Sequence, residues 1–99
     1  MIYKIVNKPE VKIDLLEAIQ YYKNINSDLA KQFLNRIKEA QFYLSENPDS
    51  FQIKYKNVRT LYLRQFPYTI HFIIESPKKQ IVILAIIHSY RNPKDYSLR

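Results

Sequence analysis

The sequence predicts an α+β domain in the order β-α-α-β-β-β, with an antiparallel helical hairpin packed on one face of a small, mainly antiparallel sheet. Two observations carry this prediction. Near the C-terminus, two runs rich in β-branched and aromatic residues, 68–75 and 80–88, flank a Ser-Pro-Lys-Lys turn, which is typical of a β-hairpin. Earlier, apolar residues recur at helical spacing from 11 to about 46, with one short polar interruption.

The first half of the chain reads as one strand and two helices. Residues 2–7 alternate in polarity, which favours a strand that ends at Lys8-Pro9. Helical spacing then runs from Val11 to about Asn24, and Ser27 or Asp28 is the expected N-cap of the next helix. Asn47-Pro48 ends that second helix. Because the connection between the helices is short, they are expected to be antiparallel.

The second half reads as a sheet with two different faces. Residues 58–66 alternate, and the hairpin strand 68–75 places Ile70, Phe72 and Ile74 on one side, which is expected to lie under the helices. Residues 81–87 are apolar at every position, which predicts a strand inside the sheet. The opposite, open face is expected to show a polar, cationic set backed by apolar residues of the last strand: Tyr62, Arg64 and His71, with Val82, Leu84 and Ile86 or their neighbours behind them.

Length and composition limit the possible classes of protein. The 99 residues suit a single domain spanning 1–99. The longest apolar run is seven residues, so we expect no membrane contact and a cytoplasmic location. There is no cysteine, and the two histidines lack ligand spacing, so we expect no metal and no cofactor. There is also no glycine, which excludes Gly-rich phosphate loops and leaves turns to Pro, Asn, Asp and Ser.

The positive charge is concentrated in the second half of the chain. Residues 1–50 hold seven basic and seven acidic residues, whereas residues 51–99 hold nine basic residues against Glu75 and Asp95. The whole net charge of +7 therefore belongs to the half that contains the hairpin. This distribution predicts an anionic partner, either nucleic acid or an acidic protein segment.

One kind of chemistry fits the residue types of this basic half. Metal-free RNA cleavage needs a base, a cation at the phosphate and an acid for the leaving oxygen. If the chain is an enzyme, it is expected to be a metal-independent endoribonuclease, although a histidine that ends a core strand is equally well a structural group. The catalytic candidates are Arg64, His71, Tyr90 and Arg91, and the candidates for phosphate or target contact are Arg59, Arg64, His88 and Arg91.

Short motifs along nearly the whole chain resemble those of the RelE/ParE superfamily, the toxins of type II toxin–antitoxin (plasmid-stabilisation) modules. The matching segments are Tyr21-Tyr22, Leu29-Ala30-x-x-Phe33-Leu34, Asn47-Pro48, Val58-Arg59, Phe66-Pro67-Tyr68-x-Ile70-x-Phe72 and Ile83-Leu84-Ala85-Ile86-Ile87-His88-x-x-Arg91-x-Pro93. The resemblance implies the same fold and a toxin–antitoxin hetero-oligomer, in which a short, acidic antitoxin segment wraps and neutralises the toxin.

Activity divides within this superfamily. RelE-like members cut mRNA on the ribosome, and ParE-like members act on DNA gyrase. The RelE-like pattern has an arginine directly after the tyrosine that matches Tyr68, whereas this chain has Thr69. The resemblance is therefore nearer the ParE-like branch and implies a gyrase-poisoning toxin, with Arg59 and Arg91 as functional residues. Two alternatives stay open: a ribosome-dependent mRNA endonuclease, and an inactive relative that only binds an antitoxin.

Overall fold

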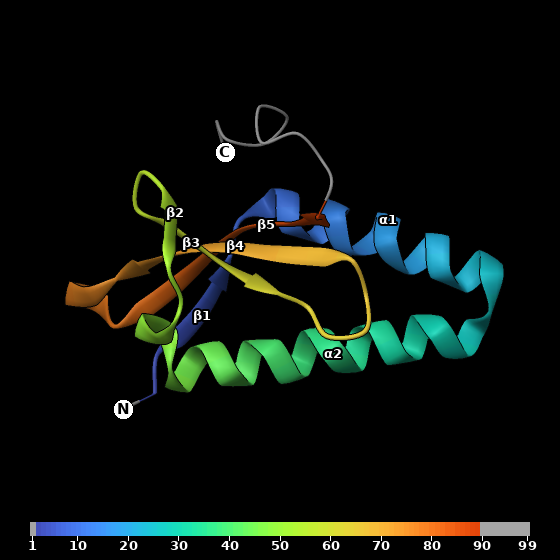
Figure 1. Ribbon diagram of the computed structural model, residues 1–99, viewed down its shortest axis with the longest axis horizontal. Coiled ribbons are helices and arrows are strands. Elements are labelled where there is room, and N and C mark those ends of the chain that lie inside the picture. Colours follow the sequence, from blue (N-terminus) through green and yellow to red (C-terminus); the bar gives the residue numbers. More distant parts are fainter. Residues whose placement is uncertain (1, 90–99) are drawn as a thin grey trace.

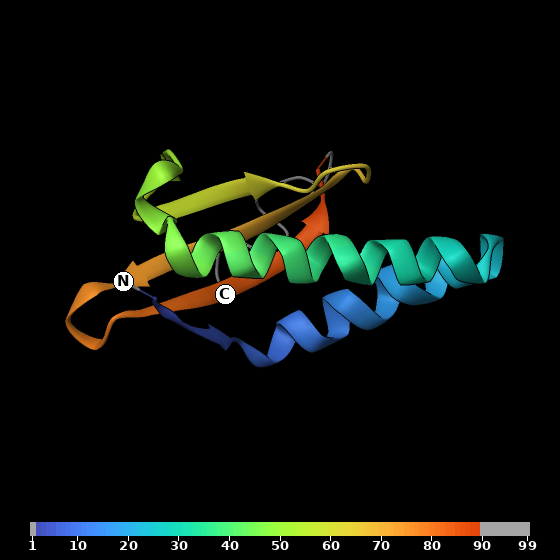
Figure 2. The same ribbon diagram turned by 90° about the horizontal axis from the view of Figure 1, so that it is seen from below.

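The protein forms a helical layer against a mixed sheet (Figure 1). The computed structural model describes residues 2–89. Two long helices lie side by side against the sheet, as the view turned by 90° also shows (Figure 2). The elements are β1 (Lys4–Asn7), α1 (Pro9–Ile25), α2 (Ser27–Glu46), the 3₁₀ turn η1 (Pro48–Ser50), β2 (Ile53–Tyr55), β3 (Val58–Tyr62), β4 (Tyr68–Glu75), the 3₁₀ turn η2 (Ser76–Lys78) and β5 (Gln80–His88).

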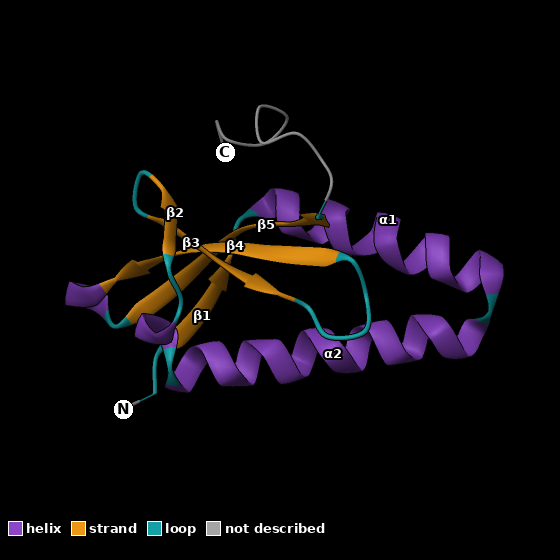
Figure 3. Ribbon diagram, viewed as in Figure 1, coloured by secondary structure: helices purple, strands orange, loops and turns teal. Residues whose placement is uncertain are grey.

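The sheet has five strands in the order β1-β5-β4-β3-β2 (Figure 3). β5 lies between β1, to which it is parallel, and β4, to which it is antiparallel. This confirms both the α+β fold and the interior position of the apolar run 81–87. Two details differ from the sequence prediction: Ile53–Tyr55 forms an additional short edge strand, and β3 ends at Tyr62 rather than at residue 66.

Local sequence explains where the helices begin. Pro9 occupies the first turn of α1, where its missing N–H costs nothing and its fixed φ suits the helix. The N-cap of α2 is Asn26, one residue before the expected Ser27 or Asp28, because the Asn26 side chain accepts a hydrogen bond of 2.7 Å from the Asp28 backbone N–H. α1 ends at Ile25 and α2 starts at Ser27, so the predicted antiparallel hairpin is confirmed.

The core lies between the helices and the sheet, and aromatic rings form its centre. Tyr22 of α1, Phe33 of α2 and Phe66 before β4 meet with centroid distances of 4.9–5.5 Å, and Tyr68 completes the cluster. Most of these contacts are edge-to-face, the arrangement that aromatic rings favour. The Phe66-Pro67-Tyr68 motif that contributes to the family resemblance is thus part of the core.

A β-bulge in β5 reverses the faces of its last residues. His71 pairs with Ala85 whereas Phe72 pairs with Ile83, so Leu84 is the extra residue. Ile86 consequently joins the core under the helices, and Ala85 and Ile87 lie on the opposite face. The expectation that Ile86 lies on the open face is therefore wrong, because the bulge shifts the side-chain alternation by one residue.

Turns in this glycine-free chain use lysine and glutamine in the left-handed region. Lys56 has φ 49°, Gln65 has φ 73° and Lys79 has φ 50°. Each follows or lies in a short connection between strands. The expectation that Pro, Asn, Asp and Ser provide all turns is wrong at these three positions, because strand pairing on both sides imposes the turn geometry.

Candidate functional site

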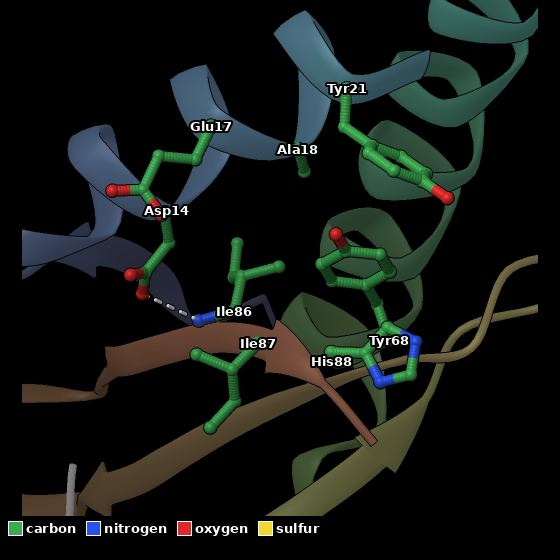
Figure 4. A pocket seen from close by; sticks show the side chains of 8 residues that line it. All are labelled: Asp14, Glu17, Ala18, Tyr21, Tyr68, Ile86, Ile87 and His88. Carbon is green, nitrogen blue, oxygen red and sulfur yellow. Dashed lines mark hydrogen bonds between the residues drawn. The ribbon is translucent and has the colours of Figure 1, made fainter. Parts of the chain in front are cut away.

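A hollow of about 210 Å³ lies between α1 and the C-terminal end of β5 (Figure 4). Polar groups gather in it from three elements: carboxylates from α1, a phenol from the start of β4 and an imidazole from the end of β5. Its lining residues are Asp14, Glu17, Ala18, Tyr21, Tyr68, Ile86, Ile87 and His88. The hollow therefore places two acidic side chains beside the basic second half of the chain.

Asp14 ties α1 to the last strand from inside this hollow. Its side chain is only 6% exposed, and its Oδ2 accepts a hydrogen bond of 3.0 Å from the Ile86 backbone N–H. β1 ends at Asn7, opposite Ile83, so no strand of the described region continues beside Ile86 on that side of β5. The carboxylate thus takes the place of a neighbouring strand for this amide. Sequence reasoning missed Asp14, although an aspartate between Val11 and Ala18 on the buried stripe was a usable signal.

Tyr68 and His88 form the wall of the hollow that faces Tyr21 in Figure 4. Their rings meet edge to face with centroids 5.5 Å apart. Burial raises the pKa of the Tyr68 phenol, with further contributions from Tyr21 and Glu17. Tyr68 is therefore a neutral hydrogen-bonding group at neutral pH, and His88 is exposed beside it.

His71 is buried, not exposed. Only 6% of the residue is accessible, and its Nδ1 lies 3.3 Å from the hydroxyl of Tyr55. Burial lowers the pKa of His71 to about 4, although Asp14 opposes this shift. His71 does lie on the face opposite Ile70 and Phe72, as predicted, because it pairs with Ala85 on that side. The expectation that it is exposed there is wrong, and Tyr55 of β2 lies against its ring. At neutral pH His71 is an uncharged interior side chain.

The two predicted arginines that the structure describes lie in separate places. Arg59 is half-buried and donates from Nη1 to the Phe51 carbonyl at 2.6 Å, which anchors the segment after η1. Arg64 follows β3, and its side chain is 72% exposed and paired with Glu39 of α2 at 3.0 Å. Arg64 therefore lies at the helical side of the molecule, whereas it was expected on the open face with His71.

The four catalytic candidates do not form one cluster in the described region. Arg64 contacts α2 and His71 lies inside the sheet. Tyr90 and Arg91 lie outside the described residues, so the structure places only Arg59, Arg64, His71 and His88 of the predicted set. His88 lies in the hollow with the Asp14 and Glu17 carboxylates, whereas Arg64 lines a different concave surface.

A second concave surface, which we term the α2–β3 groove, has a volume of about 310 Å³. Its floor and sides are mostly apolar, with charged groups at the rim. The lining residues are Arg36, Glu39, Ala40, Tyr43, Phe51, Leu61, Tyr62, Leu63 and Arg64. Tyr43 of α2 lines this groove and is 50% exposed.

Residues 2–89 contain neither a metal-binding cluster nor a membrane-spanning helix. This part of the chain contains no group of three or more His, Asp or Glu residues placed to hold a metal ion. No helix in it is both long enough and apolar enough to cross a membrane.

Comparisons with a family model and with individual known proteins agree on one family. Residues 5–93 match the family model described as the ParE toxin of the type II toxin–antitoxin system parDE. The chain belongs to this toxin family. Toxin ParE2 of Mycobacterium tuberculosis is 31% identical over 84 residues, covering 84% of this chain and 78% of that protein, in both strains compared.

Solved structures of related systems share the fold of this ParE-family chain. A chromosomal ParDE system from P. aeruginosa superposes with a TM-score of 0.75 at 21% identity, covering 88% of this chain and 96% of the other. The toxin–antitoxin complex RelBE2 from Mycobacterium tuberculosis gives 0.65 at 18% identity, covering 89% and 99%. At this level of identity the likeness shows the fold.

Proposed function

We propose that this ParE-family toxin arrests growth by acting on DNA gyrase and is neutralised by a cognate antitoxin. The observation that carries the proposal is the match of residues 5–93 to the ParE toxin model. The sequence of the second half adds support, since its charge of +7 suits both an acidic antitoxin segment and the DNA that gyrase holds.

The arrangement of the predicted RNase residues favours this proposal over mRNA cleavage. A base or acid for RNA cleavage must reach the substrate, whereas His71 is buried and neutral at pH 7. Thr69, which stands where the RelE-like pattern has an arginine, is 4% exposed and hydrogen-bonded to the Ser89 hydroxyl at 2.9 Å. This position therefore offers no cation to a phosphate.

The proposed target contacts are Arg59, Arg64, His88 and Arg91. His88 ends β5 and is exposed, so its imidazole is accessible to a partner. Arg59 already holds the Phe51 carbonyl, and its contribution to target contact would include positioning the segment after η1. Arg91 lies outside the described residues and enters the proposal through the family motif.

A supercoiling assay with purified gyrase tests the proposed target directly. Relaxed plasmid, ATP and gyrase are incubated with increasing amounts of the protein, with and without the cognate antitoxin, which we expect to be encoded by a small reading frame beside that of the toxin. Loss of supercoiling, or accumulation of cleaved plasmid, that the second protein reverses is the expected result. In parallel, primer extension on mRNA after induction of the chain alone should find no new 5′ ends within translated codons.

Different outcomes exclude different parts of the proposal. Unchanged gyrase activity together with codon-phased mRNA cuts would replace the gyrase target with the ribosome. Neither effect, with binding to the neighbouring protein intact, would make this copy an inactive antitoxin-binding relative. Arg91→Ala, compared with Lys94→Ala as the matched control, tests the carried-over arginine: equal activity of the two variants would remove Arg91 from the mechanism.

A further inference from the structure

Two turns of the sheet and the start of β1 lie at one end of the molecule, opposite the connection between the helices (at the left in Figures 1 and 2). β4 continues through η2 into β5, and β1 begins beside this turn, where the Lys4 N–H donates to the Lys79 carbonyl at 3.0 Å. The β2–β3 turn lies at the same end, because β3 is antiparallel to β4 and Arg59, near its start, lies opposite Phe72. Three segments distant in sequence therefore meet here.

This end of the sheet is rich in exposed lysines. They are Lys4, Lys54, Lys56, Lys78 and Lys79, and we term this surface the lysine end. Glu75 is the one acidic residue between positions 51 and 89, and its carboxylate accepts a hydrogen bond from the Gln80 side chain. Two further carboxylates, Glu46 of α2 and Asp49 of η1, belong to the side that the helices occupy. The positive charge is therefore concentrated on the sheet side of this end.

The spacing of the strands sets the width of the lysine end. β3, β4, β5 and β1 are successive neighbours, and at about 4.8 Å per neighbour they span about 15 Å. One strand of DNA carries about four phosphates over that length, at roughly 3.4 Å per phosphate along the helix axis. Lysine binds phosphate as a point charge on a flexible stem. A row of lysines from separate segments therefore matches a regularly spaced polyanion better than an isolated carboxylate.

Two of these lysines occupy a backbone conformation that lysine does not favour. Lys56 has φ 49° and Lys79 has φ 50°, in the left-handed region where glycine and asparagine are the usual residues. Each lysine therefore lowers stability relative to glycine while it places a positive charge at the tip of a turn. Backbone strain of this kind concentrates at functional positions. Strain and charge are independent observations, and both single out the same two residues.

We propose that the lysine end binds the phosphate backbone of double-stranded DNA, irrespective of base sequence. Lys56 and Lys79 each contact one phosphate, and the other three lysines add to the attraction. This inference rests on the proposed function, because the DNA that gyrase holds supplies the ligand. The carboxylates of α2 and η1 repel phosphate, so the DNA lies against the sheet side of this end.

Glycine substitutions test the two strained lysines, because they change DNA affinity and stability in opposite directions. Lys56→Gly and Lys79→Gly each remove a positive charge and relieve the left-handed backbone. At about 0.05 M salt each variant should bind DNA roughly threefold more weakly, and the double variant roughly tenfold. The melting temperature of each variant should rise. Fluorescence anisotropy of a labelled duplex of random sequence measures binding by the purified full-length chain, and thermal melting measures stability.

A matched pair separates position from net charge. Lys79→Gln and Lys23→Gln remove the same charge, but Lys23 lies in the last turn of α1, at the opposite end of the molecule. Lys79→Gln should weaken DNA binding roughly threefold and reduce the slope of log affinity against log salt by about one. Lys23→Gln should change the affinity less than twofold and leave the slope unchanged.

The outcomes separate this inference from the proposed function. Wild-type affinity in the double glycine variant would overturn the site, as would equal weakening by Lys79→Gln and Lys23→Gln. Equal displacement of labelled DNA by poly-glutamate and by unlabelled DNA would overturn it too, since the lysine end would then accept acidic protein segments. If the wild-type chain inhibits gyrase but does not bind the duplex, the DNA site fails and the gyrase target stands. Duplex binding with unchanged gyrase activity would overturn the gyrase target and leave the DNA site.

Discussion

Single polar side chains join distant segments of this toxin. Asp14 connects α1 of the helical layer to the backbone of β5, and His71 of β4 contacts Tyr55 of β2 within the sheet. Neither interaction is between neighbours in sequence: the first joins residues separated by 72 positions and the second by 16. In a low-dielectric interior, each such group stabilises the fold while it keeps its partner and destabilises it once the partner is removed.

Removing the Asp14 carboxylate should destabilise the protein. Asp14→Ala leaves the buried Ile86 N–H without its acceptor, and we expect the free energy of unfolding to fall by about 1–3 kcal/mol. Asp14→Asn keeps an acceptor oxygen and should lower the free energy of unfolding by less. Urea denaturation followed by circular dichroism measures both. Glu17→Ala is the control from the exposed part of the same helix, and an equally large loss there would contradict the assigned role of Asp14.

The buried His71 should make stability depend on pH. Its folded pKa is about 4, below its ordinary value of 6.5, so between these values the unfolded chain binds more protons than the folded one. The contribution of His71 is therefore complete above pH 6.5 and is lost as the pH falls towards 4, with a slope of at most about 1.4 kcal/mol per pH unit. Urea denaturation at several pH values should show this dependence, and His71→Gln should lack it; an identical profile in the variant would show that other groups are responsible.

At the scale of the elements, the turns and the bulge determine how the strands are placed. Lys79 adopts a left-handed conformation so that β4 and β5 can pair along their full length, from Glu75–Gln80 to Tyr68–His88. The bulge at Leu84 then changes which side chains face the helices. A chain without glycine bears the conformational cost of such turns with residues that have a Cβ.

Replacing a lysine whose backbone lies in the left-handed region by glycine should stabilise the fold. Lys79→Gly relieves the steric cost at φ 50°, partly offset by the greater freedom of glycine in the unfolded chain. We expect a net gain of about 0.5–1 kcal/mol. Lys78→Gly, one residue earlier in η2, should instead lower stability by a similar amount. Thermal melting of both variants measures the change in stability. A lower melting temperature in both variants would argue against strain at Lys79.

The whole molecule has its charge unevenly distributed over a sheet that is otherwise apolar. All of the net charge of +7 arises from residues 51–99, whereas α1 and α2 belong to a neutral half. A positively charged half of the molecule attracts an acidic partner at long range. Such attraction raises the association rate more than it lengthens the lifetime of the complex.

Binding of the antitoxin should therefore depend on salt mainly through the association rate. Raising the ionic strength from about 0.05 to 0.5 M should slow association roughly tenfold or more and change dissociation much less. Stopped-flow fluorescence with the purified neighbouring protein measures both rates. An association rate that does not respond to salt would exclude electrostatic steering by the basic half.

The sequence predicted the elements well and the surfaces less well. The interior position of the 81–87 run and the helical hairpin follow from periodicity, and the family follows from motifs that are visible in the chain; the strand order itself is known only from the structure. The predicted site followed strand alternation, and that rule failed at the bulge, which turned Ile86 towards the helices. For His71 the rule gave the right face but not its burial, since Tyr55 of β2 lies against it. Asp14 and the groove beside Tyr43 were not found, because their roles depend on segments distant in sequence.

The sequence by itself determined the fold class, the interior position of β5 and the location of the charge in the second half, since these depend on side-chain periodicity and composition. Tertiary structure alone decided which polar groups are accessible: it buried His71 against Tyr55 and joined Asp14 to Ile86. The physical reason is that hydrophobicity is a local property of the chain, whereas desolvation and hydrogen bonding depend on which distant segment arrives alongside.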